Sequence, residues 1–305
     1  MDITILLNAM PGAIAQGLIW GIMAIGVYIT YKVLDVADLT VDGTMCTGGA
    51  VSIMMMLSGH NIWFSLFVAV LAGMLAGLVT GVFHTAMGIP AILAGILTQL
   101  SLYSINLKVM GKSNQAISVE KYDLLVSLRY IKGVPFYQNT IFIVAIFTII
   151  IIAVLYWFFG TELGCSLRAT GCNPNMSRAQ GINTKWSVVL GLMISNGLVA
   201  LSSALFSQYQ GFADINMGRG AIVIGLAAVI IGNVVFEKIF HNFALKLLSV
   251  SIGAVIYYVV LQVVIWIGLD TDLLKLLSAL VVAFFLAVPY WKKEYFTKPI
   301  KRGED

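Results

Sequence analysis

The sequence predicts an all-α, polytopic transmembrane helical bundle of about nine spans, and three observations lead to this prediction. Of the 305 residues, 60% are hydrophobic and only 10% are charged, whereas about 25% of the residues in a soluble domain are charged. The charged residues are clustered, so long uncharged stretches lie between them. Within those stretches, the period-2 alternation of a membrane strand is absent. This composition excludes an ordinary soluble globular enzyme, a nucleic-acid reader and a disordered chain.

The uncharged stretches predict the number and the positions of the spans. The longest one, from Asp42 to Lys108, holds 65 residues, which is enough for roughly three crossings of about 20 residues each. Turn-forming residues interrupt it at 58–61 and 88–90. The second and seventh spans are short, so a broken or tilted helix is the alternative for each, and eight to ten spans fit the sequence. Nine are expected, at 11–31, 43–57, 62–84, 89–107, 139–159, 186–206, 220–235, 243–268 and 273–291.

The basic residues predict how this single transmembrane domain, residues 1–305, is oriented. The first apolar segment lacks a basic region before it, which favours a retained helix over a cleaved signal peptide. Lysine and arginine are densest in the tail 292–305, and such clusters lie on the cytoplasmic side of membranes. We therefore expect a cytoplasmic C-terminus, an outer N-terminus, an inner loop at 160–185 and an outer loop at 108–138.

The inner loop contains the signals of a short isolated helix. Asn173 suits the N-cap, Pro174 suits the first helical position and Gly181 suits the left-handed position after the helix. Two turns are too few for stability in water without a packing partner. The loop is therefore either a docking element for a cytoplasmic partner or an amphipathic segment on the bilayer surface.

The stretch GCSLRATGCNPNMSRAQG at 164–181 resembles the cytoplasmic loop of ABC importer permeases of the ribose and branched-chain amino-acid type. A second match, DLTVDG at 38–43, resembles an amino-acid-uptake subgroup of these permeases, which includes transporters of aromatic amino acids. The similarity covers roughly residues 12–290. It implies a coupling helix that docks on an ATP-hydrolysing subunit. The residues that it assigns to this coupling are Arg168, Asn173, Pro174, Asn175, Ser177, Arg178 and Gly181.

The same resemblance implies the partners and the cellular location. The subunit would work as a homodimer in a bacterial plasma membrane, with two ATP-binding subunits and an extracytoplasmic substrate-binding lipoprotein. The chain itself offers only the P-loop fragment Gly111-Lys112-Ser113, and Asn106 stands where that motif needs its leading glycine. We therefore expect no enzymatic activity and no cofactor in this chain, with ATP and Mg²⁺ used by the partner subunit.

Polar residues near and within the spans are candidates for a translocation pathway. Asp35, Asp38 and Asp42 flank a helix end, where a solvated or capping role competes with a role in substrate or proton binding. Polar residues inside the spans are neutral, which predicts a weakly binding pathway instead of a charged relay, although some will only tie helices together. The expected pathway residues are Asp38, Asp42, Gln99, Asn106, Asn196 and Gln208.

The remaining motifs predict packing and loops. Glycines at 73, 77 and 81 and at 17 and 21 form GxxxG patterns, which favour close helix packing. The three histidines lack metal-site spacing, so no metal site is expected. The segment 207–219 is either the mouth of the pathway or a re-entrant gate. The outer loop 108–138 either contacts a soluble binding protein or is simply solvated.

The expected function is that of the permease subunit of an ATP-driven importer. The solute is expected to be small, polar and organic, and an amino acid, possibly an aromatic one, is favoured. An importer permease for a sugar or a nucleoside is one alternative. A secondary transporter or channel without an ATPase partner is another, and a membrane-embedded enzyme is a third.

Overall fold

The computed structural model describes residues 3–118, 122, 124–131, 138–236 and 239–268, and residues 273, 276, 279, 280, 282–284 and 287. The basic tail 292–305 and most of the predicted span 273–291 lie outside this set. Helix α1 continues directly into a π-helix, η1, and a 3₁₀ turn, η2, precedes α5. The elements are α1 (Ile3–Tyr28), η1 (Ile29–Val33), α2 (Thr40–Leu57), α3 (Ile62–Thr85), α4 (Ala91–Met110), β1 (Asn114–Ala116), η2 (Leu128–Ile131), α5 (Thr140–Gly160), α6 (Glu162–Cys172), α7 (Pro174–Ala179), α8 (Thr184–Gln210), β2 (Phe212–Asp214), α9 (Ala221–Phe236) and α10 (Phe243–Trp266).

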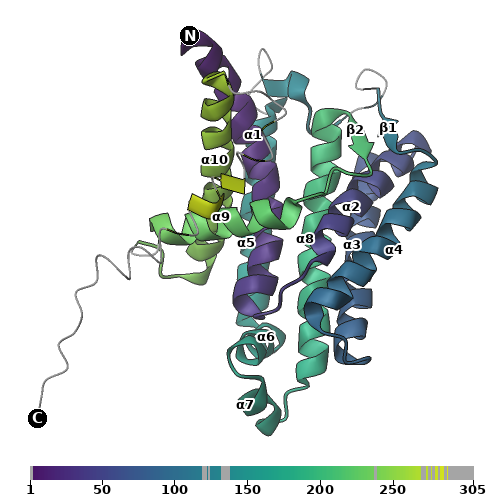
Figure 1. The fold of residues 1–305 in the computed structure, drawn as a ribbon, viewed down its shortest axis with the longest axis vertical. Coiled ribbons are helices and arrows are strands. Elements are labelled where there is room, and N and C mark those ends of the chain that lie inside the picture. Colours follow the sequence, from purple (N-terminus) through teal and green to yellow (C-terminus); the bar gives the residue numbers. More distant parts are fainter. Residues whose placement is uncertain are drawn as a thin grey trace, which may run out of the picture.

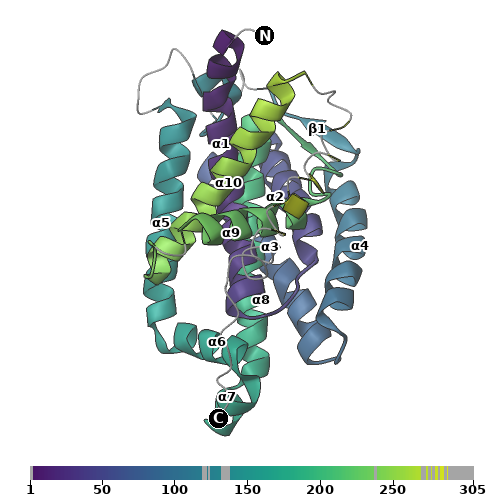
Figure 2. The same cartoon turned by 60° about the vertical axis from the view of Figure 1, so that its left-hand side comes forward.

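The chain is an all-α, multi-pass membrane protein, as predicted. Among the described residues, six helical segments are long and apolar enough to cross a bilayer: α1 with η1, α3, α4, α5, α8 and α10. The two spans predicted to be short correspond to α2, with 18 residues, and α9, with 16. Figures 1 and 2 both show α9 running across the direction of its long neighbours.

The predicted helix breaks are confirmed, and two helix ends differ from the prediction. Asn61 begins α3 by accepting a hydrogen bond from the Trp63 N–H at 3.2 Å, and Pro90 stands directly before α4. Helix α1 begins at Ile3 instead of residue 11, so Pro11 lies inside the helix and not at its start. Helix α8 extends to Gln210, where Gly211 ends it in the left-handed conformation with φ of 80°.

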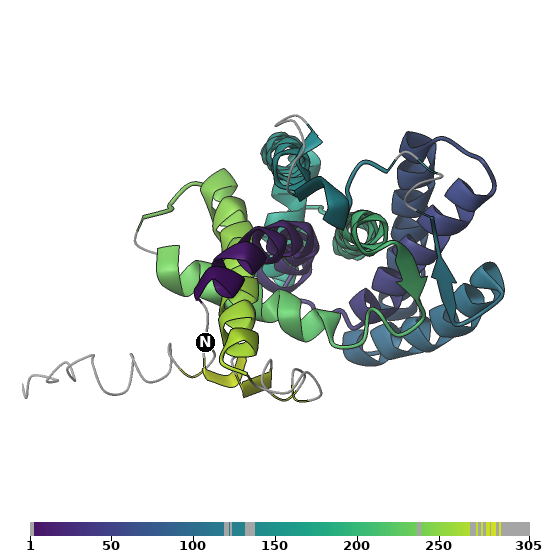
Figure 3. The same cartoon turned by 90° about the horizontal axis from the view of Figure 1, so that it is seen from above.

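Helix α8 holds the bundle together, and glycines allow its close contacts. Figure 3 shows α8 between the group of α2, α3 and α4 and the group that contains α1 and α10. A Cβ atom added at Gly77 would lie 2.7 Å from the carbonyl carbon of Leu192, and Gly73 and Gly81 also lie against α8. Gly17 and Gly21 of α1 pack in the same way on α10. The packing role predicted for both GxxxG patterns is confirmed.

The structure adds a small sheet that the sequence did not predict. Strands β1 and β2 pair antiparallel, with Asn114 opposite Asp214, and so join the predicted outer loop to the segment 207–219. Three-residue strands are too short to show an alternating pattern. The first four residues of 207–219 are helical and belong to α8, so this segment is not a continuous loop. The sheet and the start of α1 lie at one end of the molecule, and α7 lies at the other (Figures 1 and 2).

Candidate functional site

Helix α7 has the capped geometry that its sequence predicted. The Asn173 Oδ1 atom accepts hydrogen bonds from the backbone N–H groups of Asn175 at 3.1 Å and Met176 at 3.0 Å. Pro174 occupies the first helical position, where a missing N–H group costs nothing. Gly181 follows the helix with φ of 83°. A helix of only six residues is therefore fixed at both ends by its own sequence.

The same helix projects from one end of the bundle and exposes an apolar side chain. Met176 is 59% exposed, a large fraction for a side chain of this kind. The next residue, Ser177, is buried and its hydroxyl donates to the Asn173 carbonyl at 3.0 Å. The Arg178 Nε atom donates to the Thr184 hydroxyl at 2.9 Å and so ties α7 to the start of α8. Of the residues assigned to coupling, Arg178 and Ser177 thus hold α7 in place.

Helix α6 links α7 to the membrane helices. Gly171 lies against the backbone of Val33 in η1, so close that any larger side chain would overlap it. Arg168 turns back toward the bundle, where its guanidinium donates to the Phe159 carbonyl at 2.7 Å and lies 5.6 Å from the centre of the Phe243 ring. A displacement of α7 would therefore reach α5, η1 and the start of α10 through tightly packed contacts.

Asp38 belongs to a buried network that joins α2 to α8. Its side chain is 2% exposed. One carboxylate oxygen accepts the Thr40 N–H at 2.9 Å, and the other accepts the Asn196 Nδ2 at 2.7 Å. The Asn196 Oδ1 in turn accepts the Thr44 hydroxyl at 2.7 Å. Asp38 therefore ties the start of α2 to α8 through hydrogen bonds within the bundle.

Asp42 caps a different helix from the one that carries it. Its two oxygens accept the backbone N–H groups of Gly220 and Ile222, each at 3.0 Å, at the start of α9. A carboxylate at this position is stabilised by the positive end of the helix dipole. Asp42 therefore fixes the transverse helix α9 to α2. Asp35, the third acid of the group, is exposed.

Three of the predicted pathway residues line one cavity of about 130 Å³. Asp42, Gln99 and Asn106 face it together with Tyr103 and Arg219, so α2, α4 and the turn before α9 enclose it. Asn106 is 1% exposed, and its Oδ1 atom has no hydrogen-bond partner among the described residues. Tyr103 was not assigned to the pathway, although it follows Gln99 by four residues and so shares its helix face. Arg219 had been placed in the mouth segment.

The other predicted pathway residues lie elsewhere. Asn196 serves the Asp38 network, and Gln208 is fully buried on α8, where neither of its amide atoms is paired with another described residue. Neither lines the cavity that contains Asp42. Within the part of the chain that the structure describes, no group of three or more His, Cys, Asp or Glu side chains is placed to hold a metal ion.

Comparisons with known proteins find a matching family, similar sequences and a similar fold. A family model described as "Branched-chain amino acid transport system / permease component" matches residues 10–286. The chain is 37% identical over 281 residues to the tyrosine transport system permease protein of Clostridioides difficile, covering 92% of this chain and 91% of that protein. It is 24% identical to the fructose import permease protein FruF of Bifidobacterium longum, covering 80% and 67% of the two chains. The solved structure of PsaBC from Streptococcus pneumoniae in complex with Fab shares its fold, with a TM-score of 0.55, 16% identity and coverage of 97% and 99%.

Proposed function

Because the chain belongs to the family of branched-chain amino acid transport permease components, we propose that it is the membrane subunit of an ATP-driven amino-acid importer. The named relative from Clostridioides difficile supports an aromatic amino acid such as tyrosine as the substrate. Membership of a permease family also implies partners that bind ATP and the substrate. We place the complex in a bacterial plasma membrane, with α7 and the C-terminus on the cytoplasmic side.

The observation that carries this proposal is the anchored, exposed helix α7. Its cap fixes its shape, Met176 presents an apolar side chain to a partner, and Gly171 joins α6 to η1. We propose that Met176 inserts into a groove of the ATP-binding subunit. In this proposal Arg168 positions α6. The shape of α7 is set by Asn173, Pro174, Asn175, Ser177, Arg178 and Gly181. Closure of the ATP-binding subunits then moves α6 against η1 and α5 and opens the pathway to alternate sides.

The cavity beside Asp42 forms part of the proposed pathway. Carboxylate, guanidinium and amide groups together suit a zwitterion, because an ammonium group and a carboxylate need partners of opposite charge. Leu100 and Tyr103 on its rim are 64% and 45% exposed, so this wall is open on the side of α4. We propose that a second copy of the chain supplies the opposite wall, which makes the working unit a homodimer.

The proposal is tested by reconstituting the chain with its ATP-binding subunits and binding lipoprotein in liposomes. We expect uptake of labelled tyrosine that depends on ATP. A Met176→Asp variant should lose ATP-dependent uptake while inserting normally. Met87→Asp is the matched control, because Met87 is 62% exposed but lies in the turn between α3 and α4. Uptake without any ATP-binding subunit would refute the proposal in favour of a secondary transporter, and uptake of fructose but not tyrosine would favour the sugar alternative.

A further inference from the structure

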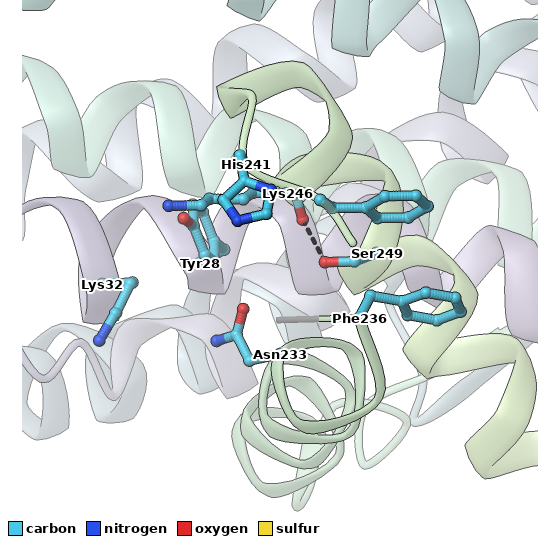
Figure 4. Close-up of a pocket in the computed structure, with 8 residues that line it drawn as sticks. Tyr28, Lys32, Asn233, Phe236, His241, Lys246 and Ser249 are labelled. Carbon is cyan, nitrogen blue, oxygen red and sulfur yellow. Dashed lines mark hydrogen bonds between the residues drawn. The ribbon is translucent and has the colours of Figure 1, made fainter. Parts of the chain in front are cut away.

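A second cavity, of about 240 Å³, lies between η1, α9 and α10 and gathers basic side chains from distant parts of the sequence. Lys32, His241 and Lys246 line it, and all three are exposed (Figure 4). No carboxylate is present among the described residues that line it. Glu237 and Lys238 lie outside the described residues, and their formal charges cancel. The cavity therefore has a net positive charge.

The same cavity also contains neutral groups that can form hydrogen bonds with a ligand. Tyr28 is 5% exposed and Asn233 is half-buried, and both line the cavity. Figure 4 shows one hydrogen bond among the residues drawn, from the Ser249 hydroxyl to the Lys246 carbonyl at 2.7 Å. The Tyr28 hydroxyl and the Asn233 amide have no hydrogen-bond partner in the part of the chain that the structure describes. The cavity therefore combines basic side chains with a hydroxyl and an amide that are unpaired among the described residues, which a cluster of surface lysines alone would not offer to a ligand.

The surroundings of the cavity are those of a membrane interface. His241 also lines a neighbouring pocket, where Trp157 is 71% exposed, Tyr156 is 50% exposed and Arg168 adds another positive charge. Exposed tryptophan and tyrosine side chains mark the level of lipid head groups. Val235, Ile239 and Leu245, each adjacent in sequence to a residue that lines the cavity, are exposed and offer apolar surface for acyl chains.

We propose that this cavity binds the phosphate of an anionic phospholipid head group. Lys32 and Lys246 would pair with the phosphate oxygens, and the Tyr28 hydroxyl and Asn233 amide would donate to the same group or to its glycerol. Basic cavities between transmembrane helices on the cytoplasmic side are suited to anionic head groups. Lys32 of η1 lines the cavity and η1 contacts α6, so the bound lipid would brace η1 where α6 packs on it. The proposal rests on the proposed cytoplasmic orientation of α7, and it does not depend on which solute the protein transports.

The test measures lipid binding to the purified chain by native mass spectrometry, with phosphatidylglycerol and phosphatidylcholine compared. We expect phosphatidylglycerol to bind preferentially, and the double variant Lys32→Gln, Lys246→Gln to weaken its binding roughly thirtyfold, about five- to sixfold per lysine. Lys32→Arg with Lys246→Arg should retain binding, which separates loss of charge from loss of fold. Lys185→Gln is the control, because Lys185 is exposed near α7 but does not line the cavity.

A competition arm identifies the source of the phosphate. If inorganic phosphate fails to displace the lipid, the ligand is the lipid itself, as proposed. If millimolar inorganic phosphate displaced the lipid from the wild-type chain, and the double variant no longer bound phosphate, the lipid would be overturned as the ligand. The cavity would then be assigned to a free anion. Equal binding of phosphatidylglycerol by the wild-type chain and the double variant would overturn the site altogether.

Discussion

The N-cap of α7 allows a quantitative test of the coupling mechanism. Replacing Asn173 with alanine removes both hydrogen bonds to the first turn, from Asn175 and Met176. Loss of such a cap typically costs about 1 kcal/mol, which corresponds to a roughly fivefold change in an equilibrium. A helix of six residues has little stability of its own to absorb this loss. We therefore expect the ratio of ordered to disordered α7 to fall roughly fivefold, and ATP-dependent uptake to fall in proportion to the ordered fraction of α7.

The assay is uptake per ATP hydrolysed in proteoliposomes that contain the complete importer. Asn61→Ala is the matched control, because it removes the same kind of cap from α3, which has 24 residues and packs along α8. Asn173→Asp keeps the accepting oxygen and should stay near the wild-type value. If Asn173→Ala and Asn61→Ala gave the same uptake per ATP, the order of α7 would not control coupling.

Three further predictions concern the packing and capping of the bundle. Gly77→Ala should lower the thermal midpoint in detergent through overpacking that costs about 1–3 kcal/mol, whereas Gly12→Ala, whose Cβ would meet its nearest neighbour at 3.7 Å, should not. Asn196→Leu should destabilise the protein by about 3 kcal/mol, because it leaves one of the two oxygens of the buried Asp38 carboxylate without a donor. In a double-mutant cycle with Asp38→Asn, strict additivity of the two losses would contradict the bond between them. Asp42→Ala should speed hydrogen exchange at the start of α9 by roughly tenfold, for about 1–2 kcal/mol of lost capping, and an unchanged exchange rate would show that α9 does not need this cap.

The features that the sequence predicted are those with local signals. The breaks at 58–61 and 88–90 and the caps of α7 depend on residues within a few positions of one another, so a short stretch of sequence is enough to predict them. The glycine patterns predicted that helices would pack closely, but nothing in them identifies α8 as the partner of α3.

The features that the sequence could not predict depend on contacts between distant residues. Asp42 caps a helix that begins almost 180 residues later, and the sequence marks only that a carboxylate stands near a helix end. Lys32 and Lys246 line the same cavity only because α1 and α10 pack side by side. Three of the six expected pathway residues share one cavity, and the other three do not. Polarity marks a residue in a span as a candidate for the interior of the bundle, but it does not show which neighbouring helix the residue will face.

The bond between Asp38 and Asn196 has a consequence for how the protein is made. The two residues are 158 positions apart, so at about 5–20 residues per second the ribosome needs roughly 8–30 s to produce the partner. During that interval α2 to α7 are synthesised, while Asp38 has the Thr40 N–H but lacks the Asn196 amide, and a carboxylate short of partners costs at least a few kcal/mol in lipid. The bond that ties α2 to α8 can therefore form only after the first half of the bundle has been made. Chains that stop before α8 should be recognised as unfinished and degraded.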